Sequence, residues 1–308
     1  MIKATNLIKY YGQKLAINGI HFELKKGEIV GLLGLNGSGK TTTLRILTGF
    51  LIPTEGEVTI NGISNFNDPI EAKKHIGYLP ETPPLYEDMT VESYLLHVSR
   101  LKGIAEDKLK AEIDRVVQKT ALTEERDNFL GNLSLGYRKR AGIAQALLGA
   151  PPVIIMDEPI SGLDPKQIME MRKLIRSLAG EHTVLISSHI LSELQKTCDR
   201  FLFLHDGKIQ FNYNKEELDR ELQKLALLEV NLTGKSVVEM RNFVKSLDKD
   251  IQIRSEEEEM DGITFSLKST NEVQCREKLL DSFKEKGLKL QYLKKQEVTL
   301  EQIFLTSF

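Results

Sequence analysis

The octet Gly34–Thr41 constrains this chain more than any other feature of its sequence. It reads Gly-Leu-Asn-Gly-Ser-Gly-Lys-Thr, and it fits the pattern of a glycine, four residues and Gly-Lys-Ser/Thr that is typical of phosphate-binding loops. The apolar run Ile29–Leu33 before it predicts a buried strand, and Thr41–Thr48 after it predicts a helix. A loop between such a strand and helix predicts an α/β fold in which the octet holds the phosphates of a nucleotide.

The residue types of the octet suit this chemistry. Glycines let successive backbone N–H groups turn toward one anion, and the N-terminus of the following helix adds a partial positive charge. Lys40 is expected to reach the β- and γ-phosphates, and the Thr41 hydroxyl is expected to ligate the Mg²⁺ that bridges them. A glycine-rich turn with a surface lysine is the alternative. The residues expected to contact phosphate are Gly34, Asn36, Gly37, Ser38, Gly39, Lys40, Thr41 and Thr42.

A second apolar strand, Val153–Met156, ends in the acids Asp157 and Glu158. Open α/β sheets bind ligands beyond the C-terminal ends of their strands, so these carboxylates are expected beside the phosphates. Asp157 would hold the Mg²⁺ through water, and Glu158 would orient or deprotonate the water that attacks the γ-phosphorus. Ordinary solvated acids after a strand are the alternative.

Two more polar side chains follow strands. Glu81 comes after the short strand at 76–79 and is a candidate sensor of the γ-phosphate, although most glutamates in such a place are simply solvated. His189 follows the strand at 183–187. Its Nε2 would donate to the γ-phosphate, unless the ring serves as a cap or as a core hydrogen-bonding group.

An aromatic side chain near the N-terminus is a candidate for the base. Tyr11 lies on the expected connection between strands at 2–10 and 21–24, and its ring would stack on adenine. A half-buried strand tyrosine is the alternative, and Tyr10 is equally well placed for either role.

A group of helices is expected between these strands. From 91 to about 122 the apolar positions recur at steps of three and four residues. Ser134 then precedes a further helix with several apolar positions, and its simplest role is that of N-cap. Because free N–H groups and a capping hydroxyl also suit a phosphate, the same helix end is a candidate second anion site.

Taken in order, these motifs resemble one family closely, the nucleotide-binding subunits of ATP-binding-cassette (ABC) transporters. The resemblance spans roughly residues 1–220 and is nearest to bacterial ATPases of the gliding-motility and multidrug-export type. The matching segments are Tyr11 (the adenine-stacking aromatic), Gly34–Thr42 (Walker A), Glu81 (Q-loop), Leu133–Tyr137 (signature), Ile154–Glu158 (Walker B), Ser161–Asp164 (D-loop) and His189 (switch histidine).

This resemblance implies a fold and a mechanism. Residues 1–218 would form an ABC ATPase core with a mixed sheet, an antiparallel β subdomain and a helical subdomain at about 88–150. The subunit would bind ATP and Mg²⁺, the metal being held by Thr41, Asp157 and Glu81, with Glu158 and His189 as catalytic residues. Two such subunits would pair head to tail, so that the signature residues of one cover the ATP of the other and Asp164 lies in the D-loop; these signature residues are Ser134, Leu135, Gly136 and Tyr137.

The partners implied are a separate integral membrane permease and a second ATPase subunit, either identical or different. The pair would drive the permease from the cytoplasmic face of the membrane, in export. The chain departs from the usual family pattern at Glu81, where glutamine is usual and the carboxylate accepts but does not donate a hydrogen bond. It also departs at Leu135 and Tyr137, which replace a glycine and a glutamine of the signature, and at Ile160, where threonine is usual.

Composition agrees with a globular protein of this kind. The 308 residues are 41% hydrophobic and 28% charged with a formal charge of −2, which does not favour nucleic acid as a partner. No uncharged apolar run is long enough to cross a bilayer and no secretion signal opens the sequence, so we expect a cytoplasmic location, peripheral to the membrane. Cys198 and Cys275 stand far apart and are expected to be reduced thiols.

Residues 219–308 change character and predict a separate α+β domain with a ferredoxin-like order of strands and helices. Glu256–Glu259 is expected at a solvated hairpin tip, with a metal or basic-partner site as the alternative. Thr299–Phe304 resembles the closing segment of the exporter ATPases. We hypothesise that this accessory domain tunes closure of the ATPase dimer.

Two other functions share part of this pattern. A DNA-repair or translation ATPase of the same family would use the same engine, but a repair clamp needs a long coiled coil and a translation factor usually has two cassettes, whereas each motif occurs once here. A simple phosphate-transferring kinase leaves the signature and the D-loop without a purpose. The transporter subunit is the favoured interpretation.

Overall fold

The computed structural model describes residues 1–225, 227–247, 251–259, 262–268, 272–283, 287–296, 298 and 302–303. The chain divides into two compact units, Met1–Lys215 and Glu216–Phe308. The division lies close to the boundary expected after residue 218.

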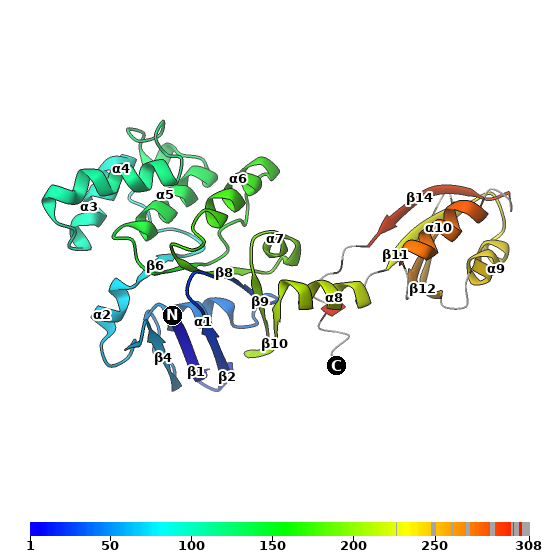
Figure 1. Ribbon diagram of the computed structural model, residues 1–308, viewed down its shortest axis with the longest axis horizontal. Coiled ribbons are helices and arrows are strands. Elements are labelled where there is room, and N and C mark those ends of the chain that lie inside the picture. Colours follow the sequence, from blue (N-terminus) through cyan, green and yellow to red (C-terminus); the bar gives the residue numbers. More distant parts are fainter. Residues whose placement is uncertain are drawn as a thin grey trace. The chain divides into compact units, whose positions relative to one another are not determined.

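A mostly parallel sheet forms the centre of the first unit (Figure 1). Every residue of its strands β3 (Ile29–Leu33), β7 (Val153–Met156) and β8 (Thr183–Ser188) is buried, as is usual for parallel strands covered on both faces. Neighbouring strands run parallel except for the antiparallel pair of β9 and β10. The strand order is β10 (Lys208–Asn214), β9 (Arg200–His205), β3 (Ile29–Leu33), β8 (Thr183–Ser188), β7 (Val153–Met156) and β6 (Ile76–Leu79).

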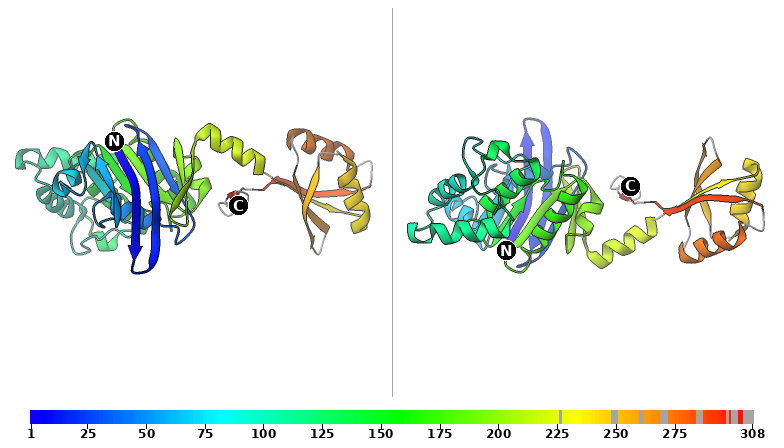
Figure 2. Two further views of the ribbon diagram at one scale, coloured as in Figure 1. Left: turned by 90° about the horizontal axis from the view of Figure 1, so that it is seen from below. Right: turned by 90° about the horizontal axis from the view of Figure 1, so that it is seen from above.

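An antiparallel sheet forms a second layer of this unit. Figure 2 looks at the unit from opposite sides and shows β1 and β2 in front of the parallel strands in one view and behind them in the other. One hydrophobic core joins both sheets to α1 (Lys40–Leu47), which contributes Leu44, Ile46 and Leu47. The order in this sheet is β2 (Lys14–Leu24), β1 (Ile2–Tyr11), β4 (Glu55–Ile60) and β5 (Ile63–Ser64).

The first hairpin differs from its sequence-based prediction. Tyr11 is the last residue of β1 and pairs with Lys14, so only Gly12 and Gln13 connect the strands. Gly12 permits this tight turn because its φ is 59°, in the left-handed region. The second strand begins at residue 14 rather than 21, and the register shifts between β1 and β2 hid this from a strict alternation pattern.

The predicted group of helices is present. The helices α3 (Val91–Leu101), α4 (Leu109–Lys119) and α5 (Leu135–Leu147) pack against one another at one end of the first unit (Figure 1). Side-chain caps define where several helices begin, because they satisfy free N–H groups of the first turn. Thr90 caps α3, Ser134 caps α5, and Asp164 caps α6 (Pro165–Arg176). The remaining short elements of the unit are α2 (Pro69–Lys74), α7 (Leu191–Gln195) and 3₁₀ turns at Glu106–Lys108 and Leu130–Asn132.

No helix among the described residues is both long enough and apolar enough to traverse a bilayer.

The second unit has the ferredoxin-like order of elements that the sequence predicts. Its sheet order is β12-β13-β11-β14 with every neighbouring pair antiparallel, and its core includes Val230, Phe243 and Phe265. After α8 (Lys215–Leu225), the elements are β11 (Leu228–Thr233), α9 (Val237–Leu247), β12 (Gln252–Glu259), β13 (Gly262–Lys268), α10 (Glu272–Ser282) and β14 (Lys289–Lys295).

The acidic run of this unit does not form a hairpin tip. Glu256–Glu259 are strand residues of β12, paired in register with β13. Glu256 receives hydrogen bonds from the Arg241 guanidinium, and Glu259 receives them from Thr264 and Asn231. Charges on this edge strand oppose pairing with another sheet. The predicted closing segment Thr299–Phe304 lies, except for residues 302–303, outside the described residues.

The close packing of α5 on β6 yields a test. A Cβ at Gly77 would collide with the backbone carbonyl oxygen of Ala146 and lie 2.8 Å from Ile154 Cδ1. We expect Gly77→Ala to lower the free energy of unfolding by about 3 kcal/mol and the Tm by roughly 5–10 °C, measured by thermal unfolding.

Gly103→Ala is the matched control, because nothing lies within 4 Å of its Cβ position while its φ is 73°. It should cost only about 1 kcal/mol, the price of the left-handed conformation. Equal destabilisation by the two substitutions would contradict the assigned packing.

Candidate functional site

A hollow of about 730 Å³ lies at the edge of the parallel sheet where β3, β6, β7 and β8 end. Its lining includes many of the residues that the sequence singles out. These are Tyr11, Asn36, Gly37, Gly39, Lys40, Thr41, Thr42, Glu81, Glu158 and His189, and they are joined by Lys14, Leu15, Ala16, Asp206 and Gly207. Gly34, Ser38 and Asp157 are not among the lining residues.

The octet between β3 and α1 wraps around the Lys40 ammonium. Lys40 Nζ donates to the carbonyl oxygens of Gly34 (2.8 Å) and Leu35 (3.3 Å) and lies 3.8 Å from Glu158 Oε1. Burial lowers the pKa of Lys40, and the nearby carboxylates of Glu158, Asp157 and Glu81 oppose this shift. The ammonium is therefore a nearly buried charge surrounded by oxygen acceptors, the surroundings that phosphate oxygens would also supply.

Close approach of the chain explains two glycines of the octet, Gly34 and Gly39. Gly39 is the N-cap of α1 at φ 109°, and a Cβ there would lie 2.9 Å from the Ala16 carbonyl oxygen. A Cβ at Gly34 would collide with Ser38 Oγ. Among the described residues the Ser38 hydroxyl has no hydrogen-bond partner although it is buried. A bound anion at the N-terminus of α1 would satisfy such a group.

The acids after β7 are joined by a serine from the neighbouring strand. Ser187 Oγ donates to Asp157 Oδ1 at 2.5 Å and accepts from the Glu158 backbone N–H at 2.9 Å. Asp157 is almost fully buried, at 1% exposed. Since β7 and β8 are adjacent parallel strands, the last residues of β8 lie beside the acids, and Ser187 fixes both of them.

Glu158 has a strained backbone and a crowded carboxylate. Its φ of 47° places a non-glycine residue in the left-handed region, which costs about 1–2 kcal/mol. His189 Nδ1 lies 3.1 and 3.2 Å from its two carboxylate oxygens, which leaves Nε2 of the ring for another partner. The structure thus brings Lys40, Glu158 and His189 together, as the sequence predicts.

Tyr11 and Glu81 also face this hollow. Tyr11 is 47% exposed with Lys9 Nζ 5.7 Å from its ring centroid, and the hollow's lining does not include Tyr10. Glu81 follows Pro80 at the end of β6 and is exposed. Stacking by Tyr11 and phosphate sensing by Glu81 remain predictions.

The signature residues lie elsewhere on the first unit. Ser134 caps α5 by accepting from the Tyr137 N–H at 3.5 Å, and a Cβ on Gly136 would meet the Gln167 side chain at 2.8 Å. Asp164 caps α6 and accepts from the Gln167 N–H at 2.9 Å. The signature and the D-loop therefore pack together, whereas neither contributes to the hollow around Lys40.

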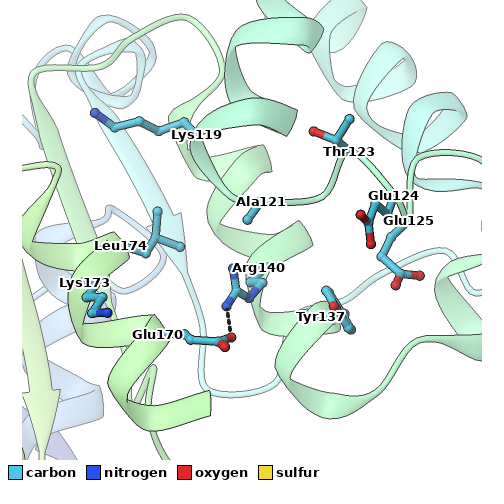
Figure 3. A pocket seen from close by; sticks show the side chains of 10 residues that line it. All are labelled: Lys119, Ala121, Thr123, Glu124, Glu125, Tyr137, Arg140, Glu170, Lys173 and Leu174. Carbon is cyan, nitrogen blue, oxygen red and sulfur yellow. Dashed lines mark hydrogen bonds and ion pairs between the residues drawn. The ribbon is translucent and has the colours of Figure 1, made fainter. Parts of the chain in front are cut away.

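A second hollow, of about 600 Å³, is lined by residues of α5, of α6 and of the segment after α4 (Figure 3). Arg140 bridges it, donating to Glu170 Oε2 at 2.7 Å and to the Thr120 carbonyl oxygen at 3.1 Å. The Arg140 guanidinium also lies 5.9 Å from the Tyr137 ring centroid. Tyr137, which replaces the usual glutamine, is thus held against Arg140 on α5.

Sequence reasoning missed Ser187 and Lys139. Ser187 and Ser188 end an otherwise apolar strand, and hydroxyls at that sheet edge were a usable signal. Lys139 is buried and donates to the carbonyl oxygens of Glu158 (2.7 Å) and Ser161 (2.8 Å). Its place on the buried face of α5, one turn after Gly136, was the signal.

The fold and this site define a P-loop nucleoside triphosphatase. The family model described as ABC transporter matches residues 17–161. The bacitracin transport ATP-binding protein BcrA of Bacillus licheniformis is 36% identical over 307 residues, which cover 99% of this chain and 96% of that protein. The Nod factor export ATP-binding protein I of Burkholderia orbicola is 37% identical over 208 residues, covering 67% of this chain and 68% of that protein.

Solved structures agree. The ATP-binding subunit of an ABC transporter has a TM-score of 0.64 and 29% identity, covering 72% of this chain and 92% of that chain. A dimeric ATP-binding cassette in a post-hydrolysis state with ADP and phosphate has a TM-score of 0.63 and 27% identity, covering 70% of this chain and 99% of that chain. The chain belongs to the ABC transporter family, as an ATP-binding subunit that hydrolyses ATP.

The hydrogen bonds of Ser187 yield a second test. Ser187→Ala leaves the buried Asp157 carboxylate and the Glu158 N–H each without one partner. Loss of a hydrogen bond that orients a residue of a site typically lowers activity by about 10- to 100-fold. We therefore expect ATP turnover, measured as phosphate release, to fall by about that factor.

Ser177→Ala is the control for this test. The Ser177 hydroxyl bonds only locally, to the Leu174 carbonyl oxygen at 2.7 Å, and its loss should leave turnover unchanged. Wild-type turnover by the Ser187→Ala variant would show that Ser187 has no role in ATP hydrolysis.

Proposed function

We propose that this chain is the motor subunit of an exporter, pairing head to tail with a second ATPase subunit and driving a separate integral membrane permease from the cytoplasmic face. The observation that carries the proposal is the separation of two half-sites within the first unit. Lys40 and Glu158 line one hollow, and the N-terminus of α5 with Ser134 and Gly136 lies apart from it. A second subunit that brings its own α5 to this hollow would complete the site.

The relatives support the transport role. Those described above are named for bacitracin transport and Nod factor export, and a further similar structure is described as part of an ABC transporter complex. Both names refer to cargo that leaves or crosses a membrane, which favours export over a role on DNA or the ribosome. Either an identical or a different cassette would serve as the second subunit.

Each residue of the hollow has its own role in binding or hydrolysing ATP. Lys40 and the N–H groups at the start of α1 bind the β- and γ-phosphates and offset their charge. Glu158 orients the attacking water and accepts its proton, and His189, whose Nδ1 faces Glu158, offers Nε2 to the γ-phosphate. Tyr11 stacks on adenine at the outer end of the hollow.

The site also fits Mg²⁺. The Thr41 hydroxyl, the Asp157 carboxylate and the Glu81 carboxylate are hard oxygen donors of the kind that Mg²⁺ prefers. Two of them, Thr41 and Glu81, line the hollow, and Asp157 precedes Glu158, which also lines it. When bound, the ion would offset negative charge on the phosphates and on the leaving group.

The proposed role of Glu158 as general base is tested by the substitution Glu158→Gln. The amide keeps the shape but accepts no proton, so hydrolysis should stop while ATP with Mg²⁺ still closes the dimer. Light scattering after size exclusion should show the mass doubling on addition of ATP, and phosphate release should fall by at least about a hundredfold.

The double variant Lys40→Ala with Glu158→Gln is the control, since it should not dimerise with ATP. If the Glu158→Gln variant binds ATP and remains a monomer, pairing with an identical subunit is contradicted. A different ATPase subunit would then be favoured as the partner. Unchanged hydrolysis by Glu158→Gln would contradict the assigned base.

The metal ligand is tested by Asp157→Asn. Removing one negative charge from the Mg²⁺ site should raise the Mg²⁺ concentration for half-maximal hydrolysis by about tenfold or more. A titration of activity against Mg²⁺ at saturating ATP measures this, with Asp206→Asn, which changes an exposed acid of the same hollow, as control. Equal shifts in the two variants would argue against Asp157 as a ligand.

A further inference from the structure

Lys139 is a buried cation that the chemistry above does not use. It lies in α5 and is 3% exposed. Its ammonium donates to two backbone carbonyl oxygens, those of Glu158 at 2.7 Å and Ser161 at 2.8 Å. Glu158 lies in the turn that follows β7, and Ser161 is the first residue of the D-loop.

The main chain of Glu158 is held from two sides. Its N–H donates to Ser187 Oγ from β8, and its carbonyl oxygen accepts from Lys139 of α5. Between these bonds the residue adopts its left-handed conformation, at φ 47°. A strained conformation persists only when the surrounding structure holds it in place. These two hydrogen bonds hold the main chain of Glu158 in its left-handed conformation.

The acceptors of Lys139 show what it does. The carboxylates of Glu158, Glu81 and Glu193 are near enough to favour the charged ammonium, while burial disfavours it and lowers the pKa of Lys139. The hydrogen bonds nevertheless go to carbonyl oxygens and not to any of these carboxylates. Lys139 therefore fixes backbone geometry, beyond balancing charge.

The position of Lys139 on α5 joins two parts of the proposed mechanism. It lies one helical turn after Gly136, on the helix whose N-terminus Ser134 caps. A rigid helix moves as one body, so displacement of the N-terminus of α5 also displaces the Lys139 ammonium and the carbonyl groups that it binds.

We propose that Lys139 is a positioning residue that links the signature helix to the catalytic carboxylate of the same subunit. Contact of α5 with the nucleotide of the paired subunit sets the position of Lys139, which in turn sets the backbone of Glu158 and of the D-loop. This inference rests on the proposed function of Glu158 and of the head-to-tail pair.

Lys102 offers a matched control. It donates to two carbonyl oxygens as well, those of Gln145 and Leu148, each at 2.9 Å. These acceptors lie at the C-terminal end of the same helix, and Lys102 does not line the nucleotide hollow. Lys102 is the exposed residue at the C-terminal end of α3, whereas Lys139 is buried within α5, so the control repeats the pattern of two carbonyl acceptors at a place away from the site.

The experiment compares Lys139→Met with Lys102→Met in the full chain, by steady-state ATP hydrolysis and thermal unfolding. For Lys139→Met we expect kcat to fall at least about tenfold with KM for ATP within roughly threefold of wild type, because binding is kept and only the reacting geometry is lost. Lys139→Arg keeps the charged donors and should recover kcat to within about threefold. Lys102→Met should lower the Tm by less, because Lys102 is exposed, and should leave kcat unchanged.

Equal losses of kcat in Lys139→Met and Lys102→Met would overturn the proposal, and so would wild-type kcat in Lys139→Met. Where Lys139→Met does not fold, Lys139→Gln replaces it, since its shorter amide arm does not reach both carbonyl groups. It should lower kcat by at least about threefold with KM unchanged, and wild-type kcat would again overturn the proposal. Glu158→Gln, assayed alongside, separates the two levels: if it hydrolyses ATP normally, the proposed role of Glu158 fails first.

Discussion

The site depends on holding Glu158 in a conformation that an isolated glutamate avoids. Its N–H, its carbonyl oxygen and its carboxylate each have a partner from a different element, namely Ser187 of β8, Lys139 of α5 and His189 after β8. Buried charges are tolerated only when they are paired and hydrogen-bonded. Here the ammonium groups of Lys40 and Lys139 are buried beside the carboxylates of Asp157 and Glu158, so the charges of the site offset one another.

The order of strands explains how distant residues meet. The octet follows β3, the acids follow β7 and His189 follows β8, and β8 lies between β3 and β7 in the sheet. All three strands are parallel, so their C-terminal ends share one edge. Their uniform burial fixes the register, since a slipped strand would expose apolar side chains or bury polar ones.

Much of this was predictable because it is local. The octet, the acids after Val153–Met156 and His189 after Thr183–Ser188 each follow a buried strand, and the structure brings Lys40, Glu158 and His189 to one hollow. The family itself followed from the order of these motifs, and the comparisons confirm it. The ferredoxin-like arrangement of the second unit was likewise predictable from the alternation of apolar positions.

What escaped prediction depends on partners distant in the sequence. Ser187 acts only because β8 pairs with β7, and Lys139 only because α5 packs on the turn after β7. The start of β2 was misplaced because register shifts interrupt its alternation. The acids of β12 were assigned to a tip because their pairing with β13, and the Arg241 guanidinium that binds Glu256, are not visible in a single segment.

The unusual signature also has a physical explanation. Leu135, which replaces the usual glycine, places its Cδ2 3.0 Å from where a Cβ of Gly162 would stand, and Gly162 adopts φ 76°. The Leu135 side chain therefore packs against the D-loop at Gly162. At Gly136 a Cβ would meet the Gln167 side chain, so glycine lets the backbone of this helix end lie close to α6. Leu135 and Lys139 thus contact the same short segment, from Glu158 to Gly162, from successive turns of α5. A helix attached to that segment at two points transmits a displacement of its N-terminus more faithfully than a helix attached at one, which makes the leucine a physically sensible partner for the lysine.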